Sequence, residues 1–76
     1  MSVVADRARY AFGVRWALSQ MKEKTRHEKC RRLGVTPTTL DKWRDGVSVP
    51  SDDNLARLAR AANTDQETIR SGGADD

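Results

Sequence analysis

The chain has 76 residues, of which 37% are hydrophobic and 33% are charged, and its formal net charge is +3. This length allows one small domain, which buries only about 60% of its unfolded surface, and the composition excludes an intrinsically disordered chain. There is no apolar run near the roughly 20 residues that span a membrane, no signal-peptide pattern and only one cysteine, Cys30, so we expect a protein of the reducing cytoplasm.

The charge is divided unevenly along the chain. Residues 1–50 contain eleven Lys or Arg and five Asp or Glu, a balance of +6, whereas residues 51–76 contain three and six, a balance of −3. A basic half of this kind indicates a surface that faces a polyanion such as nucleic acid. The alternative is an ordinary solvated surface on which the charges happen to segregate.

The first predicted element is a helix from Ser2 to about Lys22, a stretch that contains no proline. At about 100° per residue, two of its faces are apolar, so the helix needs two partners. Phe12 and Trp16, on the second face, predict either another internal contact or a contact with a second subunit. The first face holds Tyr10, Val14, Ala17, Leu18 and Met21, and the second holds Ala5, Ala8, Phe12 and Trp16.

Two features of this first helix leave alternatives open. Met1 to Arg9 either extends the helix or forms a loose arm whose Arg7 and Arg9 touch phosphate. Gly13, in the middle of the helix, weakens it slightly and marks either a close approach by another segment or a bend.

The next predicted helix begins at Thr25. Thr25 and Glu28 form a capping-box pattern, and Gly34 can take the left-handed conformation that ends a helix. Cys30 is expected to pack as a small hydrophobe. His27 and Cys30 provide only two ligands, whereas a closed zinc site usually has four, so no metal is expected.

A second helix follows after a three-residue turn, and the two helices together form a predicted helix-turn-helix from Thr25 to Gly46. Thr36 caps the second helix, and Pro37 takes the first helical position, where its missing N–H has no consequence. Gly46 supplies the left-handed end of this helix. Two capped helices across such a turn place the second at a steep angle, free to enter a DNA major groove.

Two more helices are predicted in the second half of the chain. Ser51 caps the first, and a capping-box pattern from Thr64 to Glu67 opens the last, short one. Residues 71–76 have nothing to bury and are predicted to be a flexible tail or the start of a linker. Since no strand candidate occurs, residues 1–70 are predicted to form an all-α domain, a compact bundle of about five short helices.

Many residues of the last four predicted helices match a known pattern at an ordered spacing: Thr25, Glu28, Leu33-Gly34-Val35-Thr36, Thr39-Leu40, Lys42-Trp43, Gly46, Pro50-Ser51, Leu55, Leu58 and Ala59. Through these residues the chain resembles, from Thr25 to about Ile69, the lambda-repressor-like, XRE-type helix-turn-helix family of phage, plasmid and bacterial regulators. The resemblance implies a five-helix domain that binds double-stranded DNA, commonly as a homodimer, and regulates transcription. We expect a repressor.

The chain departs from this family at two positions. Lys29 stands where a buried leucine is usual, so either this helix packs differently or Lys29 lays its stem across the core. Arg44 stands where an acidic residue is common, which adds a positive charge near the DNA.

The helix from Pro37 to Arg44 is expected to lie in the major groove and to read bases. Lys42 would donate to O6 and N7 of guanine or else contact a phosphate. Thr38 would hydrogen-bond a base or place its methyl group against thymine, and Pro37 would offer an apolar contact. Asp41 would accept from a cytosine amine or, as we prefer, orient Lys42 or Arg44.

Phosphate contacts are expected around the N-terminus of the helix that begins at Thr25, because its backbone N–H groups and helix dipole favour an anion. The two arginines Arg31 and Arg32 are expected to form a solvated face, with phosphate contact as the alternative. The residues expected to touch phosphate are Thr25, Arg26, Thr36, Thr39 and Arg44.

Two other functions remain open. One is the DNA-binding domain of a plasmid maintenance or partition protein that binds repeated sites, and the other is a helical adaptor that binds protein through Phe12 and Trp16 and ignores DNA. An enzyme is the weakest option, because His27 is the only histidine and no nucleophile–base pair or phosphate-binding glycine loop is evident. No cofactor or small-molecule substrate is therefore expected.

Overall fold

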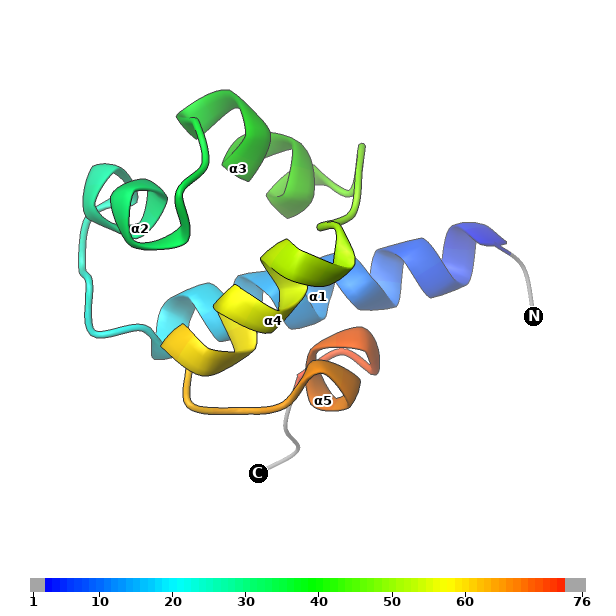
Figure 1. Ribbon diagram of the computed structural model, residues 1–76. Coiled ribbons are helices and arrows are strands. Elements are labelled where there is room, and N and C mark those ends of the chain that lie inside the picture. The colour runs from blue at the N-terminus through cyan, green and yellow to red at the C-terminus, as the bar shows by residue number, and fades with distance from the viewer. Residues whose placement is uncertain (1–2, 74–76) are drawn as a thin grey trace.

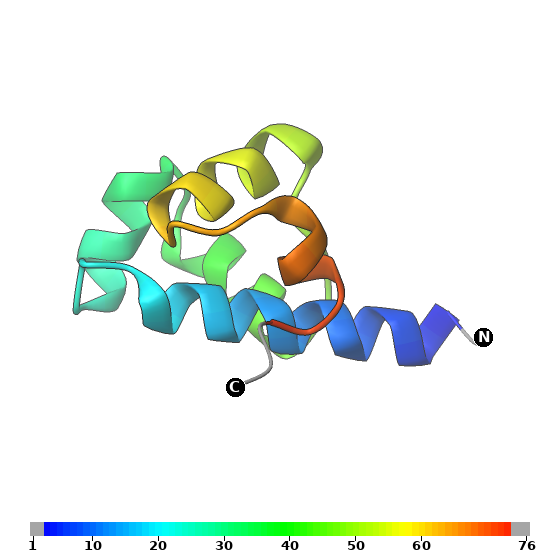
Figure 2. The same ribbon diagram turned by 90° about the horizontal axis from the view of Figure 1, so that it is seen from below.

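The computed structural model describes residues 3–73, and this range contains five helices and no strand (Figure 1). They are α1 (Val3–Gln20), α2 (Arg26–Leu33), α3 (Pro37–Asp45), α4 (Asp52–Ala61) and α5 (Gln66–Arg70). In Figure 1, α2 and α3 lie above α1 and α4, and α5 lies below them. Figure 2, seen from below, shows α5 packed against α1. The predicted all-α bundle of five helices is confirmed.

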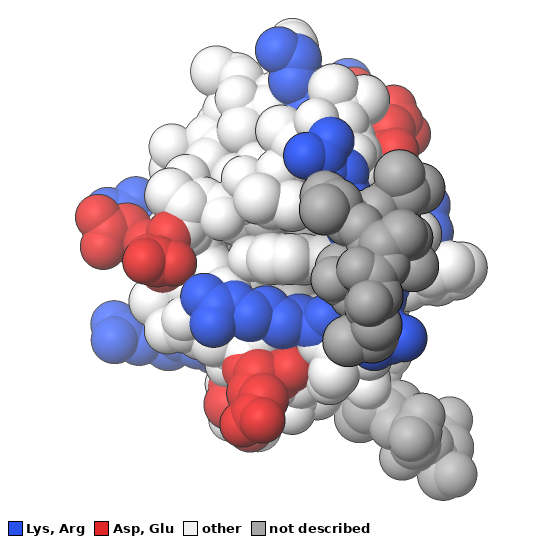
Figure 3. Space-filling view, turned by 90° about the vertical axis from the view of Figure 1, so that its right-hand side faces the viewer, with Lys and Arg blue, Asp and Glu red and all other residues white. Residues whose placement is uncertain are grey.

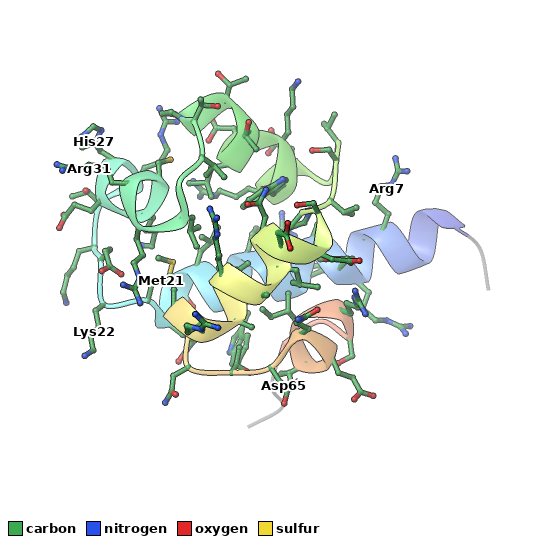
Figure 4. The ribbon with its side chains drawn as sticks, viewed as in Figure 1. Arg7, Met21, Lys22, His27, Arg31 and Asp65 are labelled. Atoms are coloured by element: carbon green, nitrogen blue, oxygen red, sulfur yellow. The ribbon has the colours of Figure 1, made fainter. Side chains whose placement is uncertain are left out.

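The first helix buries the face predicted from its periodicity. Val14, Ala17, Leu18 and Met21 are buried in the core and Tyr10 packs against it. Figure 4 shows Met21 pointing into the bundle. Because α1 begins at Val3, residues 3–9 extend the first helix and do not form a loose arm. Residues 1 and 2 lie outside the described range.

Gly13 lies where α1 meets α5. A Cβ atom at this position would overlap with the carbonyl group of Ile69, which is backbone and cannot rotate away. Only glycine therefore allows the two helices to approach this closely. Of the two alternatives for this glycine, close approach by another segment is confirmed.

The helix-turn-helix from Thr25 to Gly46 forms as predicted. The hydroxyl oxygens of Thr25 and Thr36 each accept a hydrogen bond from the backbone N–H three residues later, at 3.1 and 3.2 Å. Pro37 occupies the first turn of α3. Gly34 and Gly46 end the two helices with φ angles of 71° and 77°, in the left-handed region where a Cβ is unfavourable.

The last helix begins one residue later than predicted. The prediction placed the cap at Thr64, but the cap is Asp65, whose carboxylate accepts a hydrogen bond from the Thr68 N–H at 2.7 Å. The Thr64 N–H instead donates to the carbonyl of Ala59 at 2.8 Å, so Thr64 belongs to the turn that follows α4. Ile69 is fully buried and anchors α5, as predicted.

The Asp65 cap is expected to make the stability of the fold depend on pH. The backbone hydrogen bond from Thr68 is the main cause that holds the pKa of the Asp65 carboxyl below its ordinary value of 3.8. Because the folded pKa is the lower one, the cap stabilises the fold above a pH of about 4, and this contribution is lost as the pH falls through the folded pKa. We expect the Asp65 carboxyl carbon to titrate below 3.8 by NMR, and Asp65→Asn to remove this part of the pH dependence. Titration at or above the ordinary value would show that the cap is not formed.

After α5 the chain turns back against α1. Gly72 and Gly73 have φ angles of 104° and 97°, and the Gly73 N–H donates to the Thr68 carbonyl at 2.9 Å. A Cβ at Gly73 would lie 2.8 Å from Cγ of Trp16, so this turn covers one side of that ring. The tail predicted at residues 71–76 is described only to Gly73, and residues 74–76 lie outside the described range.

Candidate nucleic-acid interface

Helix α3 divides its side chains between the core and the solvent. Leu40 and Trp43 are only 1% and 3% exposed. Pro37, Thr38 and Lys42, the residues predicted to read bases, are exposed. Among the side chains of residues 7–73, the Lys42 ammonium has no acidic partner within 4.0 Å. These three side chains are therefore available to a ligand.

A hollow of about 310 Å³ lies between α1, the N-terminal end of α2 and α3. Its lining includes five cationic side chains and no acidic one, and Leu18 and Leu40 supply apolar surface. We name this hollow the basic groove. Its basic residues are Arg15, Lys24, Arg26, Lys29 and Arg44.

The basic groove is a local concentration of charge. Figure 3 views the molecule from the N-terminal end of α1, and on that face acidic and basic side chains are interspersed, with red groups next to a blue side chain and uncharged surface around them. Since that face is not uniformly basic, the net charge of +3 alone does not account for the groove.

The groove contains two of the residues predicted to touch phosphate, Arg26 and Arg44. Thr25 lies beside it as the N-cap of α2. Thr36 and Thr39 lie at the N-terminal end of α3, where the Thr36 hydroxyl donates to the Thr39 hydroxyl at 3.0 Å, and they do not line the groove. The structure thus joins the two arginines and leaves these two threonines apart from them.

Asp41 binds Arg26. The Nη1 atom of Arg26 donates to both carboxylate oxygens of Asp41, at 3.0 and 3.2 Å. The interpretation that Asp41 orients Lys42 or Arg44 is wrong. Because the start of α2 packs against α3, Arg26 lies within hydrogen-bond distance of the Asp41 carboxylate. The two side chains are 53% and 44% exposed, so the pair contributes at most about 1 kcal/mol to stability.

Three groove residues, Arg15, Lys24 and Lys29, were not among those predicted to touch phosphate. The Arg15 guanidinium carbon lies 4.6 Å from the centre of the Phe12 ring, a cation–π contact, and its Nη1 donates to the Arg44 carbonyl at 3.0 Å. Lys29 is half-buried and its Nζ donates to the Lys24 carbonyl at 3.4 Å, which favours the alternative in which its stem lies along the core. No local pattern marks Arg15, because the packing of α1 against α3 places it; for Lys29 the only signal was its departure from the family's leucine.

Phe12 and Trp16, the residues considered for a partner contact, have different surroundings. Phe12 is 63% exposed. Trp16 is half-buried, packs against the core and is covered on one side by the turn at Gly73. They do not form one continuous exposed aromatic patch.

Cys30 is buried in the core, as predicted, and this burial raises the pKa of its thiol. Among the side chains of residues 7–73, no group of three or more His, Cys, Asp or Glu is arranged to hold a metal ion. Nor does any helix within residues 3–73 combine the length and the apolar composition needed to cross a membrane.

Comparisons of this chain with protein-family models, with curated proteins and with solved structures gave no match. What the chain does is therefore inferred from its fold and its charged surface.

Proposed function

We propose that this protein binds double-stranded DNA, with α3 in the major groove and the basic groove on a phosphate backbone. One observation carries the proposal. The lining of the basic groove contains five cationic side chains and no acidic one, and the groove borders α3, the second helix of the helix-turn-helix. A helix fits a major groove about 12 Å wide, and lysine and arginine supply the phosphate contacts that fix its position.

Three exposed residues of α3 contact bases in this proposal. Lys42 donates to O6 and N7 of guanine, Thr38 hydrogen-bonds a base or contacts a thymine methyl group, and Pro37 adds an apolar contact. Thr36 and Thr39 contact the phosphate backbone at the start of α3. The N-terminus of α2 adds backbone N–H groups and its positive dipole end.

The biological role we propose is a transcriptional repressor, in agreement with the resemblance to lambda-repressor-like domains. The alternative is a plasmid maintenance or partition protein that binds repeated sites. The arrangement of the bound sites distinguishes these roles: inverted repeats are expected for a homodimeric repressor, and direct repeats favour the alternative.

Selection of bound sequences from random duplex DNA tests base reading. We expect one preferred sequence, and we expect Lys42→Ala to weaken binding by about 1–3 kcal/mol and to relax the preference at one base pair. Lys22→Ala is the matched control, because Figure 4 shows Lys22, two residues after the end of α1, pointing away from the bundle. A loss with Lys42→Ala that is equal for all sequences would instead place Lys42 on a phosphate.

Asp41→Asn is expected to increase DNA affinity about fivefold, because it removes one negative charge near the phosphates, worth about 1 kcal/mol at 4 Å in water. It also frees the Arg26 guanidinium for a phosphate. Fluorescence anisotropy with a labelled duplex at fixed salt measures the change. Weaker binding would show that Asp41 accepts from a base or that its hold on Arg26 is required.

A second candidate function, protein binding without DNA, is favoured by the exposed Phe12. Its ring borders a hollow of about 420 Å³ that Ala8, Ala11 and Gly46 also line. A gel shift on bulk duplex DNA at low salt separates the two functions, since a protein-binding adaptor would give no shift.

A further inference from the structure

A second concentration of positive charge lies at the C-terminal end of α2, whereas the basic groove lies toward its N-terminal end. A hollow of about 310 Å³ lies between the C-terminal end of α2 and α4. Its lining consists of four arginines and Gly34. We name these arginines the arginine cluster; they are Arg31, Arg32, Arg57 and Arg60.

No acidic side chain among residues 7–73 forms an ion pair with this cluster; Glu23 lines a neighbouring hollow together with Arg32 and Arg60. All four side chains are exposed, and the two ion pairs among the side chains of residues 7–73 lie elsewhere, at Arg26–Asp41 and Arg70–Asp52. Glu28, one turn before Arg31 and Arg32 on α2, accepts a hydrogen bond from the Thr25 hydroxyl at 2.9 Å. Four like charges around one hollow repel one another, and an anionic ligand would relieve that repulsion.

Gly34 shapes this hollow. A Cβ on Gly34 would lie 3.1 Å from Nη1 of Arg57, and its φ of +71° also requires glycine. The residue that ends α2 therefore leaves room for a guanidinium from α4. Because α2 packs directly against α4, the two helices hold their arginines together.

The arginine cluster is set apart from the exposed face of α3. Helix α2 has eight residues, so at 1.5 Å per residue its ends are about 12 Å apart. The basic groove lies toward its N-terminal end and the cluster toward its C-terminal end. Figure 4 shows Arg31 pointing outward from α2, away from α3.

The chemistry of the cluster favours a nucleic-acid backbone over an acidic protein segment. The planar guanidinium group donates two parallel hydrogen bonds to phosphate oxygens, and arginine is preferred where such recognition matters. The hollow has no aromatic or aliphatic side chain to anchor a peptide, whereas protein interfaces depend on such anchors.

We propose that the arginine cluster binds the phosphate backbone of a second DNA segment while α3 binds the first, so that one chain bridges two duplexes. The proposal rests on the proposed function for its first duplex. The second contact is independent of DNA sequence, since phosphates carry no base information.

A bridging assay tests this proposal. One duplex with the selected site is fixed to beads, a fluorescent duplex of unrelated sequence is added with the protein, and the captured fluorescence is measured. The double variant Arg57→Gln, Arg60→Gln is expected to capture about tenfold less, the effect of two lost phosphate contacts over a moderate range of salt. Its affinity for a single short duplex with the site should stay within about twofold, because those contacts lie outside that duplex.

The matched control is Arg7→Gln with Arg70→Gln, which removes the same charge from exposed arginines outside the cluster. It should leave capture unchanged. The proposal is overturned if the unchanged protein captures no second duplex. It is also overturned if the cluster variant captures as much as the unchanged protein, which is the result expected when a dimer holds one duplex on each of its two α3 helices. Equal losses of capture and of single-duplex affinity would also overturn it, because the cluster would then lie on the first duplex.

Failure of the proposed function gives a different result. If Lys42→Ala leaves the selected sequences unchanged, base reading by Lys42 fails. In that case, capture of a second duplex that is lost in the Arg57→Gln, Arg60→Gln variant, with single-duplex affinity kept, would still support the bridging contact.

Discussion

Gly13→Ala is expected to lower the free energy of unfolding by about 3 kcal/mol or more, the upper part of the range for overpacking. The added methyl group overlaps with the carbonyl of Ile69, so α5 must move and the buried Ile69 side chain must leave its place. The better helix propensity of alanine, worth about 1 kcal/mol, offsets only part of this loss. Because natural domains have only about 5–15 kcal/mol of stability, this variant should be partly unfolded at 37 °C. Urea denaturation followed by circular dichroism measures the effect.

Ala8→Gly is the control for the helix propensity of α1. Ala8 is exposed, so this change should cost only about 1 kcal/mol. If Gly13→Ala proves as stable as the unchanged protein or more so, α1 and α5 do not approach each other as described.

The largest effect on DNA binding is expected when the basic groove is neutralised. The triple variant Lys24→Gln, Lys29→Gln, Arg44→Gln should lose between about tenfold and 100-fold in affinity at moderate salt, because three phosphate contacts are removed. Arg26 is left in place because it pairs with Asp41, and Arg15 because it packs on Phe12. The sequences selected from random DNA should stay the same, since phosphate contacts do not read bases.

The control variant for the groove removes three cations that do not line it, Arg7, Lys22 and Arg70. Its net charge equals that of the groove variant, and we expect its affinity to change by less than about twofold, since salt weakens exposed charges that do not contact phosphate. Equal losses in the two variants would mean that only the net charge matters, and the groove would then have no special role.

The local features of the fold were predictable because neighbouring residues determine them. The hydroxyl caps at Thr25 and Thr36 and the left-handed glycines Gly34 and Gly46 each depend on a few consecutive residues. The cap at Asp65 was misplaced by one residue because the pattern allowed Thr64 as well. Thr64 instead lies in the turn that follows α4, where its N–H donates back to that helix.

The candidate site was predictable only in part, because it depends on how the helices pack. Arg26 and Arg44 could be named from their place in the helix-turn-helix. The pairing of Arg26 with Asp41 spans 15 residues and follows from the contact between α2 and α3, which the periodicity of neither helix contains. Arg15 enters the groove only because α1 packs against α3.

The arginine cluster shows the same limit. On α2, Arg31 and Arg32 were interpreted as a solvated face, and they are exposed. Their significance depends on Arg57 and Arg60, which the packing of α2 against α4 brings to the same hollow. A pattern along one helix cannot show that its charged face continues on another helix.

We propose that α3 enters the major groove of duplex DNA while the cations of the basic groove bind its phosphates. The most direct test is the affinity for a short duplex with one selected site, measured by anisotropy over a range of salt concentrations. If four to six cations neutralise phosphates, log K should fall against log salt with a slope of roughly −4 to −5. An affinity that does not change with salt, or no affinity for any duplex, would contradict the claim.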